Sequence, residues 1–338
     1  MKYQPPYTIT SKIIHLIAQI SENIGRLTVL EEIHDSLKLR KANRIRTIQG
    51  SLAIEGNTLS TEQITAILNG KTVIAPPKEV QEVRNAIKAY EAFQQWQPSQ
   101  EKDLLQAHQI LMTGLIDEVG QYRHGGVGVM SGDRVVHMAP PANQINRLMA
   151  DLLDWLNDSD VHPLIQSSVF HYEFEFIHPF ADGNGRMGRL WQTLILSRWN
   201  PIFANIPVES LIYQNQKAYY EALQASTDRT DSAPFIEFIL QMILDAILSS
   251  NDTAQDSDHA TAQADVHACQ DVSEHVQRLI SIMKQEEYTL AELMQLVGLT
   301  HRATFQKNYL NPAIEADLIK RTIPDKPKSP KQKYCLKR

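Results

Sequence analysis

Apolar residues recur at helical spacing along most of this chain, and the alternating pattern of a half-buried strand is rare. Ser60 and Gln63 have the spacing of a capping box, which predicts a helix start, and Pro76-Pro77 predicts a break. The sequence therefore predicts a mostly helical chain, with helices over 8–34, 36–50, 60–70, 78–96, 99–115, 142–157, 162–177 and 186–196.

One segment, residues 122–138, departs from the helical pattern. It is rich in glycine and carries two short apolar runs, 127–130 and 135–138, on either side of a polar turn. This arrangement is typical of a β-hairpin. A loop over the core is the alternative that the pattern leaves open.

The composition changes after residue 248. Residues 251–271 hold five aspartates and no lysine or arginine, which is typical of a linker. Between Thr289 and Phe305, a capped short helix, a glycine turn and a second helix start have the pattern of a helix-turn-helix. Residues 318–338 then predict a hairpin, so the C-terminal region is predicted to be a winged helix-turn-helix domain.

Charge is segregated along the chain. The net charge is −6, yet residues 301–338 hold ten Lys and Arg against three acids, a local charge of +7. A basic helix-turn-helix domain favours the phosphate backbone of DNA. A winged-helix domain that contacts protein and carries a solvated basic tail is the alternative.

Composition limits the class of protein further. With 338 residues, of which 43% are hydrophobic and 21% charged, the chain predicts two or three globular domains. No stretch has the roughly 18 apolar residues of a membrane span, and the first residues do not have the pattern of a signal peptide. Cys269 and Cys335 are too few for a disulfide framework. We therefore expect a cytoplasmic protein without membrane contact.

The candidate chemistry is concentrated in residues 178–189, His-Pro-Phe-Ala-Asp-Gly-Asn-Gly-Arg-Met-Gly-Arg. Gly183 and Gly185 have no Cβ, so their backbone can take positive φ and turn N–H groups toward an anion, and Asn184 tolerates the left-handed region. The apolar spacing that follows predicts a helix, whose N-terminus carries unpaired N–H donors and about half a positive charge. The turn is therefore a predicted phosphate site.

Four titratable side chains flank this turn. Arg186 and Arg189 are three apart on the predicted helix, and each guanidinium can fork onto phosphate oxygens. Asp182 offers the hard oxygen that Mg²⁺ prefers, and the imidazole of His178 can accept a proton near neutral pH. A buried structural ion-pair cluster is the alternative. Arginine in a first helical turn opposes the macrodipole, however, which favours a bound anion.

This run resembles the signature of the Fic (filamentation induced by cAMP) family, His-x-Phe-x-(Asp/Glu)-Gly-Asn-Gly-Arg-x-x-Arg, at every specified position. The resemblance implies an all-α fold with a Fic-type helical core. It also implies a nucleotidyltransferase that moves AMP from Mg²⁺-bound ATP to a Tyr, Thr or Ser hydroxyl of a target protein and releases diphosphate. In that family pattern His178 is the general base and Asp182 holds Mg²⁺. The nucleotide phosphates are bound by Gly183, Asn184, Gly185, Arg186 and Arg189.

A second motif lies upstream, in Ser51-Leu52-Ala53-Ile54-Glu55-Gly56-Asn57. It is similar to the inhibitory-helix motif of the same family, (Ser/Thr)-x-x-x-Glu-(Gly/Asn). The resemblance implies that Glu55 pairs with Arg189 in the place of the terminal phosphate, with Ser51 and Gly56 completing the motif. The chain would then be a self-inhibited, class II member. A buried glutamate near a helix end at Gly56 is the alternative.

The resemblance implies roles for two further elements. The hairpin would be a flap that holds a target segment by strand addition, through Val135, Val136, His137 and Met138. A later helix would line the adenine pocket through Asn215, Tyr219 and Tyr220. Core tyrosines at helical spacing would give the same pattern.

These features together predict four parts, which are an N-terminal helical region with the inhibitory helix (1–100), a Fic catalytic core (101–248), a linker (249–271) and a winged helix-turn-helix domain (272–338).

Two classes of function stay open. One is an adenylyltransferase held off by Glu55, whose site could also remove AMP from a modified target. The other is a DNA-binding transcription regulator whose core senses a nucleotide. His178 favours the enzyme, since a sensor needs no base. The resemblance also implies a homodimer.

Overall fold

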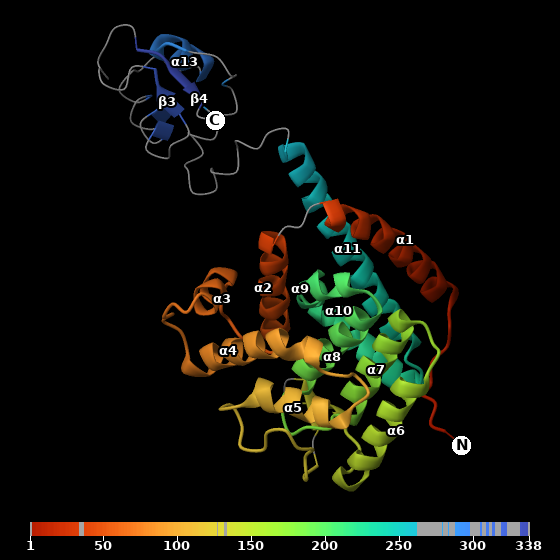
Figure 1. Cartoon of the computed structure of the whole chain (residues 1–338). Helices are drawn as coiled ribbons and strands as arrows, with labels where there is room; N and C mark the ends of the chain where they lie inside the picture. The colour runs from red at the N-terminus through yellow and green to blue at the C-terminus, as the bar shows by residue number, and fades with distance from the viewer. Residues whose placement is uncertain are drawn as a thin grey trace. The chain divides into compact units, whose positions relative to one another are not determined.

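The structure of the protein is a computed structural model. It describes residues 2–33, 37–126, 128–131, 134–261, 279, 283, 288–297, 305, 309–310, 313–314, 319–322 and 332–336. The chain divides into two compact units, Met1–Asp252 and Thr253–Arg338, each with its own hydrophobic core. The predicted all-α fold is confirmed, because the described part of the first unit consists mostly of helices with one small two-stranded sheet (Figure 1). None of the helices in the described part of the chain is long and apolar enough to cross a membrane.

The helices of the first unit follow the predicted periodicity closely. In chain order they are α1 (Ser11–Ile33), α2 (Leu37–Ile54), α3 (Thr61–Leu68), α4 (Pro77–Ala92), η1 (Phe93–Gln95), α5 (Glu101–Met112), η2 (Ala142–Gln144), α6 (Ile145–Asp158), α7 (Pro163–Ile177), α8 (Asn184–Trp199), η3 (Pro201–Asn205), α9 (Val208–Gln214), α10 (Gln216–Arg229) and α11 (Ala233–Thr261).

Helices α7 and α8 form the centre of the first unit (Figure 1). Phe170 and Phe174 of α7 and Trp191 of α8 are each fully buried. A helix that is apolar on nearly every side belongs in a core, and truncating one of these rings to alanine costs about 3–5 kcal/mol. The packing of this pair therefore fixes the loop that joins them, which holds the conspicuous motif.

Helix α3 begins as predicted. Gln63 N donates to Ser60 Oγ (3.3 Å), and Ser60 N donates to Gln63 Oε1 (2.9 Å). The capping box therefore satisfies two of the N–H groups that a helix start leaves without intrahelical partners.

Helix α2 continues past its predicted end at residue 50. Gly50 lies where α2 meets α9, and a Cβ added there would lie 2.6 Å from the backbone nitrogen of Ser210. This glycine therefore permits a close approach between two helices, and it does not mark a helix end.

Helix α11 extends into the predicted linker. Residues 251–261 continue α11 to Thr261, and the linker over 249–271 stays a prediction. Isolated acidic side chains lower helix propensity by only a few tenths of a kcal/mol each, so a long apolar helix can extend through them. Residues 262–271 lie outside the described residues.

The predicted hairpin is confirmed. Strand β1 (Gly128–Ser131) pairs antiparallel with β2 (Arg134–Met138), with Val129 opposite His137 and an irregular register between Val129 and Met130. The glycine-rich segment therefore forms the small sheet of the first unit, as its composition suggested.

The second unit has a core that includes Leu279, Leu293 and Phe305. Helix α13 (Leu290–Val297) is capped by Thr289, as expected, and β3 (Ile319–Arg321) pairs antiparallel with β4 (Tyr334–Leu336). The start of the predicted second helix, at Thr300, lies outside the described residues. The winged-helix architecture and the finer domain boundaries stay predictions.

Candidate active site

The loop between α7 and α8 begins at His178, the C-cap of α7. His178 has φ 50° and ψ 61°, a left-handed conformation that few non-glycine residues adopt. Its N–H donates to Phe174 O (2.9 Å), which closes the last turn of α7. The left-handed backbone turns the chain sharply, so the imidazole lies at the start of the loop that carries the motif.

Asn184 and His108 hold this loop in shape. Asn184 Oδ1 accepts from Phe180 N and its Nδ2 donates to Phe180 O, both at 2.9 Å. The Phe180 ring stacks on His108 with centroids 3.7 Å apart. His108 Nδ1 accepts from Gly120 N (2.9 Å), so its proton is on Nε2, which donates to Asp182 O (3.0 Å). Burial lowers the pKa of His108 to about 4 and keeps this imidazole neutral.

The first turn of α8, which we call the cradle, begins at the predicted phosphate site, and phosphate binding there stays a prediction. Gly183 precedes it with φ 84°, and the first intrahelical bond runs from Met187 N to Gly183 O (3.0 Å). The N–H groups of Asn184, Gly185 and Arg186 precede that bond and lie at the positive end of the helix. A Cβ on Gly185 would collide with the Glu55 carboxylate. Glu55 therefore already occupies the space beside the cradle.

Arg189 joins the upstream motif to this cradle. Its guanidinium donates to Glu55 Oε1 (2.6 Å), Ser51 O (2.9 Å) and Ser51 Oγ (3.1 Å). The Arg189 side chain is 1% exposed and that of Glu55 is 34% exposed. Burial alone would lower the pKa of Arg189, but the Glu55 carboxylate raises it above its ordinary value. Two motifs 134 residues apart thus meet in one ion pair between a buried arginine and a partly exposed glutamate.

Arg186 and Asp182 lie at the mouth of the cradle. Arg186 donates to Asp182 Oδ1 (3.3 Å) and to Glu82 Oε1 (3.4 Å). The Asp182 side chain is 51% exposed. Within the described part of the chain, no group of three His, Cys, Asp or Glu side chains could hold a metal ion. One exposed carboxylate fits a Mg²⁺ ion that takes its other ligands from phosphate and water.

Glu175 is a site residue that the sequence analysis missed. Its Oε2 lies 3.9 Å from His178 Nδ1, and its Oε1 lies 3.8 Å from Nε2 of the buried His171. Burial raises the pKa of Glu175 to about 7, with Glu55 adding to the rise and Arg189 opposing it. Burial also lowers the pKa of His171 to about 3, so that neighbour is neutral. The available signal was the i, i+3 spacing of Glu175 and His178.

Arg123 is a second residue that was missed. This side chain, 3% exposed, donates to the carbonyls of His178 (2.7 Å), Gly125 (2.7 Å), Pro140 (2.6 Å) and Ile177 (3.4 Å). It therefore ties the end of α7 to both ends of the segment that contains the hairpin. A single arginine next to a glycine-rich stretch gives no sequence signal for this role.

The three residues predicted for the adenine pocket differ in burial and in contacts. Tyr219 is 2% exposed, and its hydroxyl lies 3.2 Å from His171 Nε2, an arrangement that favours a structural role. Tyr220 is 48% exposed, and Asn215 donates to Leu211 O at the junction of α9 and α10. Neither Tyr220 nor Asn215 has a contact that assigns it to the binding of an adenine ring, so the adenine pocket stays a prediction.

The remaining predicted positions belong to the inhibitory motif and to the hairpin. Gly56 follows Glu55 with φ 89°, just past the end of α2. Met138, at the end of β2, is 72% exposed. The side chains of Val135, Val136 and His137 lie outside those that the structure describes.

Comparison with known proteins agrees with this geometry. Residues 98–196 match the Fic/DOC family, and residues 274–337 match the C-terminal domain of Fic-like (filamentation induced by cAMP) proteins. The proteins named protein adenylyltransferase Fic from Nematostella vectensis and Culex quinquefasciatus are 30% and 31% identical over 64% and 60% of this chain. The chain covers 52% and 40% of their lengths, about half or less.

A solved structure covers nearly the whole chain. The crystal structure of a Fic family protein from Desulfovibrio desulfuricans G20 is 53% identical, covers 99% of this chain and 98% of its own, and superposes with a TM-score of 0.75. Identity at this level over the full length, together with the loop and cradle described above, establishes the relationship. The chain belongs to the Fic family.

Proposed function

We propose that this protein is a protein adenylyltransferase that moves AMP from Mg²⁺-bound ATP to a hydroxyl side chain of a target protein and is inhibited by its own Glu55. The names of the curated relatives support the activity. One structural observation carries the proposal. The cradle of α8, the imidazole of His178 and the Arg189–Glu55 ion pair (2.6 Å) lie in one site.

The proposed chemistry needs little covalent participation from the protein. The target oxygen bonds to the α-phosphorus of ATP as the bond from that phosphorus to the bridging oxygen breaks and diphosphate leaves. His178 accepts the hydroxyl proton. The cradle N–H groups and Arg186 stabilise charge on the phosphate oxygens, and Mg²⁺ held by Asp182 would neutralise part of the remainder.

The proposed inhibition follows from competition for one cation. The buried guanidinium of Arg189 is already bonded to Glu55, and the Glu55 carboxylate lies against Gly185, beside the cradle. A nucleotide with its terminal phosphate on Arg189 therefore requires Glu55 to leave. Removing the carboxylate should permit the reactive pose.

Three interactions belong to the same proposal. The edge of β2, whose last residue Met138 is exposed, would hold a target segment by strand addition. The basic C-terminal segment, residues 301–338, would contact DNA, and the chain would form a homodimer. A monomeric mass by light scattering at micromolar concentration would exclude the homodimer, and unchanged mobility of duplex DNA would exclude the DNA contact.

The test is incorporation of label from α-labelled ATP with Mg²⁺ and a cell lysate as the source of targets. Glu55→Gly should label itself or a target more strongly than the unchanged protein, and Glu55→Gly with His178→Ala should give no label. Glu118→Gly, which removes an exposed loop glutamate, is the matched control and should behave like the unchanged protein.

Two outcomes would overturn the proposal in favour of its alternatives. Specific DNA binding that responds to nucleotide, without any AMP incorporation by Glu55→Gly, would identify a sensor. Release of AMP from a modified target by the unchanged protein, with no transfer by Glu55→Gly, would identify removal of AMP as the reaction.

A further inference from the structure

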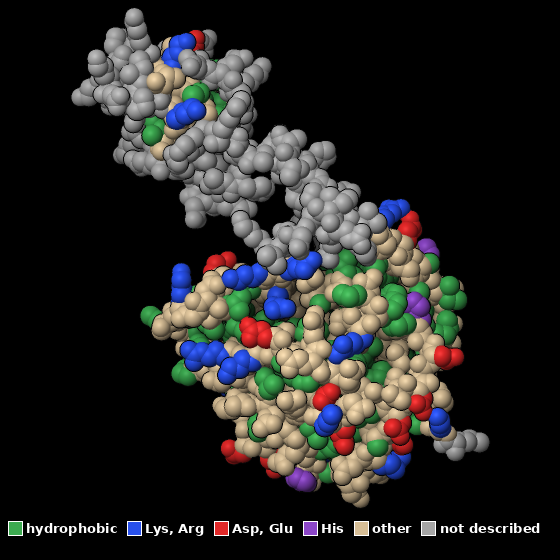
Figure 2. All heavy atoms as spheres, viewed as in Figure 1, with side chains coloured by type: hydrophobic (Ala, Val, Ile, Leu, Met, Phe, Trp, Pro, Cys, Tyr) green, Lys and Arg blue, Asp and Glu red, His purple; other side chains and the backbone are tan. Residues whose placement is uncertain are grey.

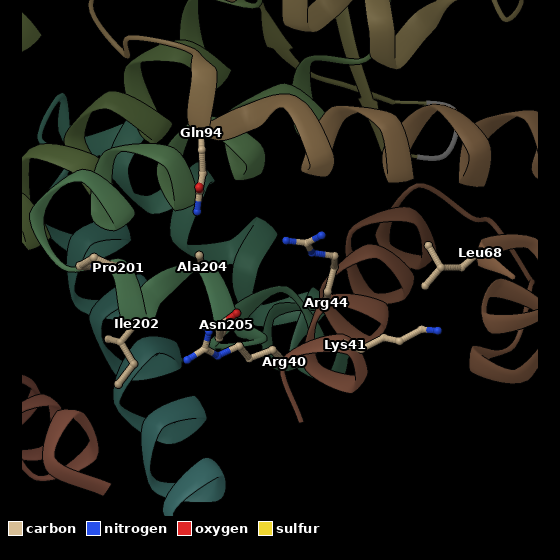
Figure 3. A pocket seen from close by; sticks show the side chains of 9 residues that line it. All are labelled: Arg40, Lys41, Arg44, Leu68, Gln94, Pro201, Ile202, Ala204 and Asn205. Atoms are coloured by element: carbon tan, nitrogen blue, oxygen red, sulfur yellow. The ribbon is translucent and has the colours of Figure 1, made fainter. Parts of the chain in front are cut away.

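A second candidate site lies on helix α2, away from the active site. A cavity of about 610 Å³ opens between α2, the end of α3, η1 and η3, and we name it the α2 pocket (Figure 3). Its volume lies within the range of pockets that bind small molecules, roughly 300–1,000 Å³. Its polar lining consists of Arg40, Lys41, Arg44, Gln94 and Asn205.

The charge of the α2 pocket is one-sided. Three of its lining residues, Arg40, Lys41 and Arg44, are cationic, and none of its lining residues is acidic. Helix α2 itself contains five Lys or Arg and no Asp or Glu. Lys and Arg side chains are seen to gather over α2 and its neighbours on this face of the unit (Figure 2). Cations that line one space repel one another, so an anion held between them is favoured.

The side chains of the α2 pocket converge from three elements. Arg40 and Arg44 of α2, Gln94 of η1 and Asn205 of η3 all border the same space (Figure 3). The Nζ of Lys41 donates to Asn69 Oδ1 (2.8 Å). Two guanidiniums can bind a phosphate with several parallel hydrogen bonds, and side-chain amides can donate to or accept from an attached polar group.

Part of the lining of the α2 pocket is apolar, and we call this part the apolar wall and the three cations the cationic wall. The apolar wall consists of Pro201, Ile202 and Ala204 of η3 and Leu68 at the end of α3. A bare inorganic ion would use the cationic wall only. A ligand with a phosphate and an apolar or planar body would use both walls.

We infer that the α2 pocket binds a small organic phosphate of mononucleotide size. The site is separate from the active site, because Arg40 and Ser51 are eleven residues apart on one helix, a rise of roughly 16 Å. The inference rests on the lining residues of this pocket and does not depend on adenylyl transfer. Since α2 presents Ser51 to Arg189, a ligand held here would contact the same helix that forms the inhibitory pair.

The test uses AMP as the probe and the full chain as the protein. The double variant Arg40→Gln, Arg44→Gln removes two exposed or half-exposed cations of the pocket. The matched control Lys217→Gln, Arg229→Gln removes the same charge from exposed positions on α10. Unchanged thermal unfolding of both variants would establish that each is folded. Titration calorimetry measures affinity, and hydrogen exchange reports which backbone segments AMP protects.

The expected result is a loss of AMP affinity of at least tenfold at one class of site in the pocket variant, and less than twofold in the control. AMP should slow hydrogen exchange over residues 40–46 and 201–205 in the unchanged protein and in the control, and not in the pocket variant. AMP should also bind this site at least tenfold more tightly than inorganic phosphate, because only AMP contacts the apolar wall.

Three results would overturn the inference. The first is equal AMP affinity of the pocket variant and the control. The second is protection confined to residues 178–190, which would place all binding at the active site. The third is a ligand preference that does not fit a small organic phosphate. Equal affinity for AMP and inorganic phosphate would identify a bare-anion site, and much tighter binding of a single-stranded oligonucleotide to the same residues would identify a nucleic-acid surface.

Discussion

The substitution Glu175→Gln should change how the stability of the first unit depends on pH. Glu175 lies within 3.9 Å of His178, its side chain is 13% exposed, and burial raises its pKa from 4.5 to about 7. Glutamine keeps the shape of the side chain and removes the titrating proton. The variant therefore isolates what it costs this fold to hold a carboxylate between two imidazoles.

The direction follows from proton binding in the two states. Between pH 4.5 and 7 the folded chain holds a proton on Glu175 that the unfolded chain has already released, so stability falls as pH rises through this window. A pKa difference of about 2.5 corresponds to about 3 kcal/mol, at roughly 1.4 kcal/mol for each pKa unit. The unchanged protein should therefore lose up to about 3 kcal/mol between pH 4.5 and 8 that the variant retains.

Tryptophan fluorescence during urea unfolding is a suitable assay. All four tryptophans, Trp96, Trp155, Trp191 and Trp199, lie in the first unit. The difference in unfolding free energy between Glu175→Gln and the unchanged protein, measured at pH 5, 6, 7 and 8, should move in favour of the variant as pH rises. Glu91→Gln, at an exposed position on α4, is the control and should show a constant difference. A constant difference for Glu175→Gln as well would refute a proton held by this buried carboxyl.

Three further substitutions test how the site is supported. The lysine in Arg123→Lys cannot donate to all four carbonyls that Arg123 contacts, so the unfolding free energy measured in urea should fall by about 2–4 kcal/mol. A loss below about 1 kcal/mol would contradict the role of Arg123 in joining α7 to the hairpin segment. Asn184→Ala loses both hydrogen bonds to Phe180 and should lower the unfolding free energy, measured by thermal unfolding, by about 2–3 kcal/mol. An unchanged melting temperature would show that the loop keeps its shape without these two bonds. Gly50→Ala should lower stability by about 1–3 kcal/mol despite the better helix propensity of alanine, because its Cβ meets the backbone at Ser210, and a gain would show that α2 and α9 can separate.

Local signals were sufficient for most of the helices. The capping box at Ser60, the hairpin in the glycine-rich segment and the helix that follows Gly183 all depend on residues within one or two turns of one another. Such features can be predicted because propensity, capping and positive φ act over short stretches of chain. The cradle belongs to this class, since its anion-binding character is a property of one turn and one helix start.

Features that depend on tertiary contact could not be found in the same way. The helical spacing of α2 did not indicate that Gly50 lies where α2 crosses α9, and it did not exclude a helix end at this glycine. Arg123 and His108 gave no pattern at all, because their partners are backbone carbonyl and amide groups supplied by distant loops. The pairing of Glu55 with Arg189 was expected only from family resemblance. No spacing rule connects two residues 134 positions apart.

Arg189 explains why inhibition and nucleotide binding would use one residue. A guanidinium that is 1% exposed cannot lose its anionic partner without a penalty of several kcal/mol, so some anion must face it in every stable state. In the state described here that anion is Glu55, supported by the carbonyl and hydroxyl of Ser51 near the negative end of α2. Glu175 is a second carboxyl near Arg189. Burial and the Glu55 charge both raise the pKa of Glu175, so it is largely protonated below neutral pH and would ionise more readily once Glu55 leaves. A terminal phosphate that replaced Glu55 would satisfy the same buried charge, so the exchange costs less than the burial of Arg189 alone would suggest.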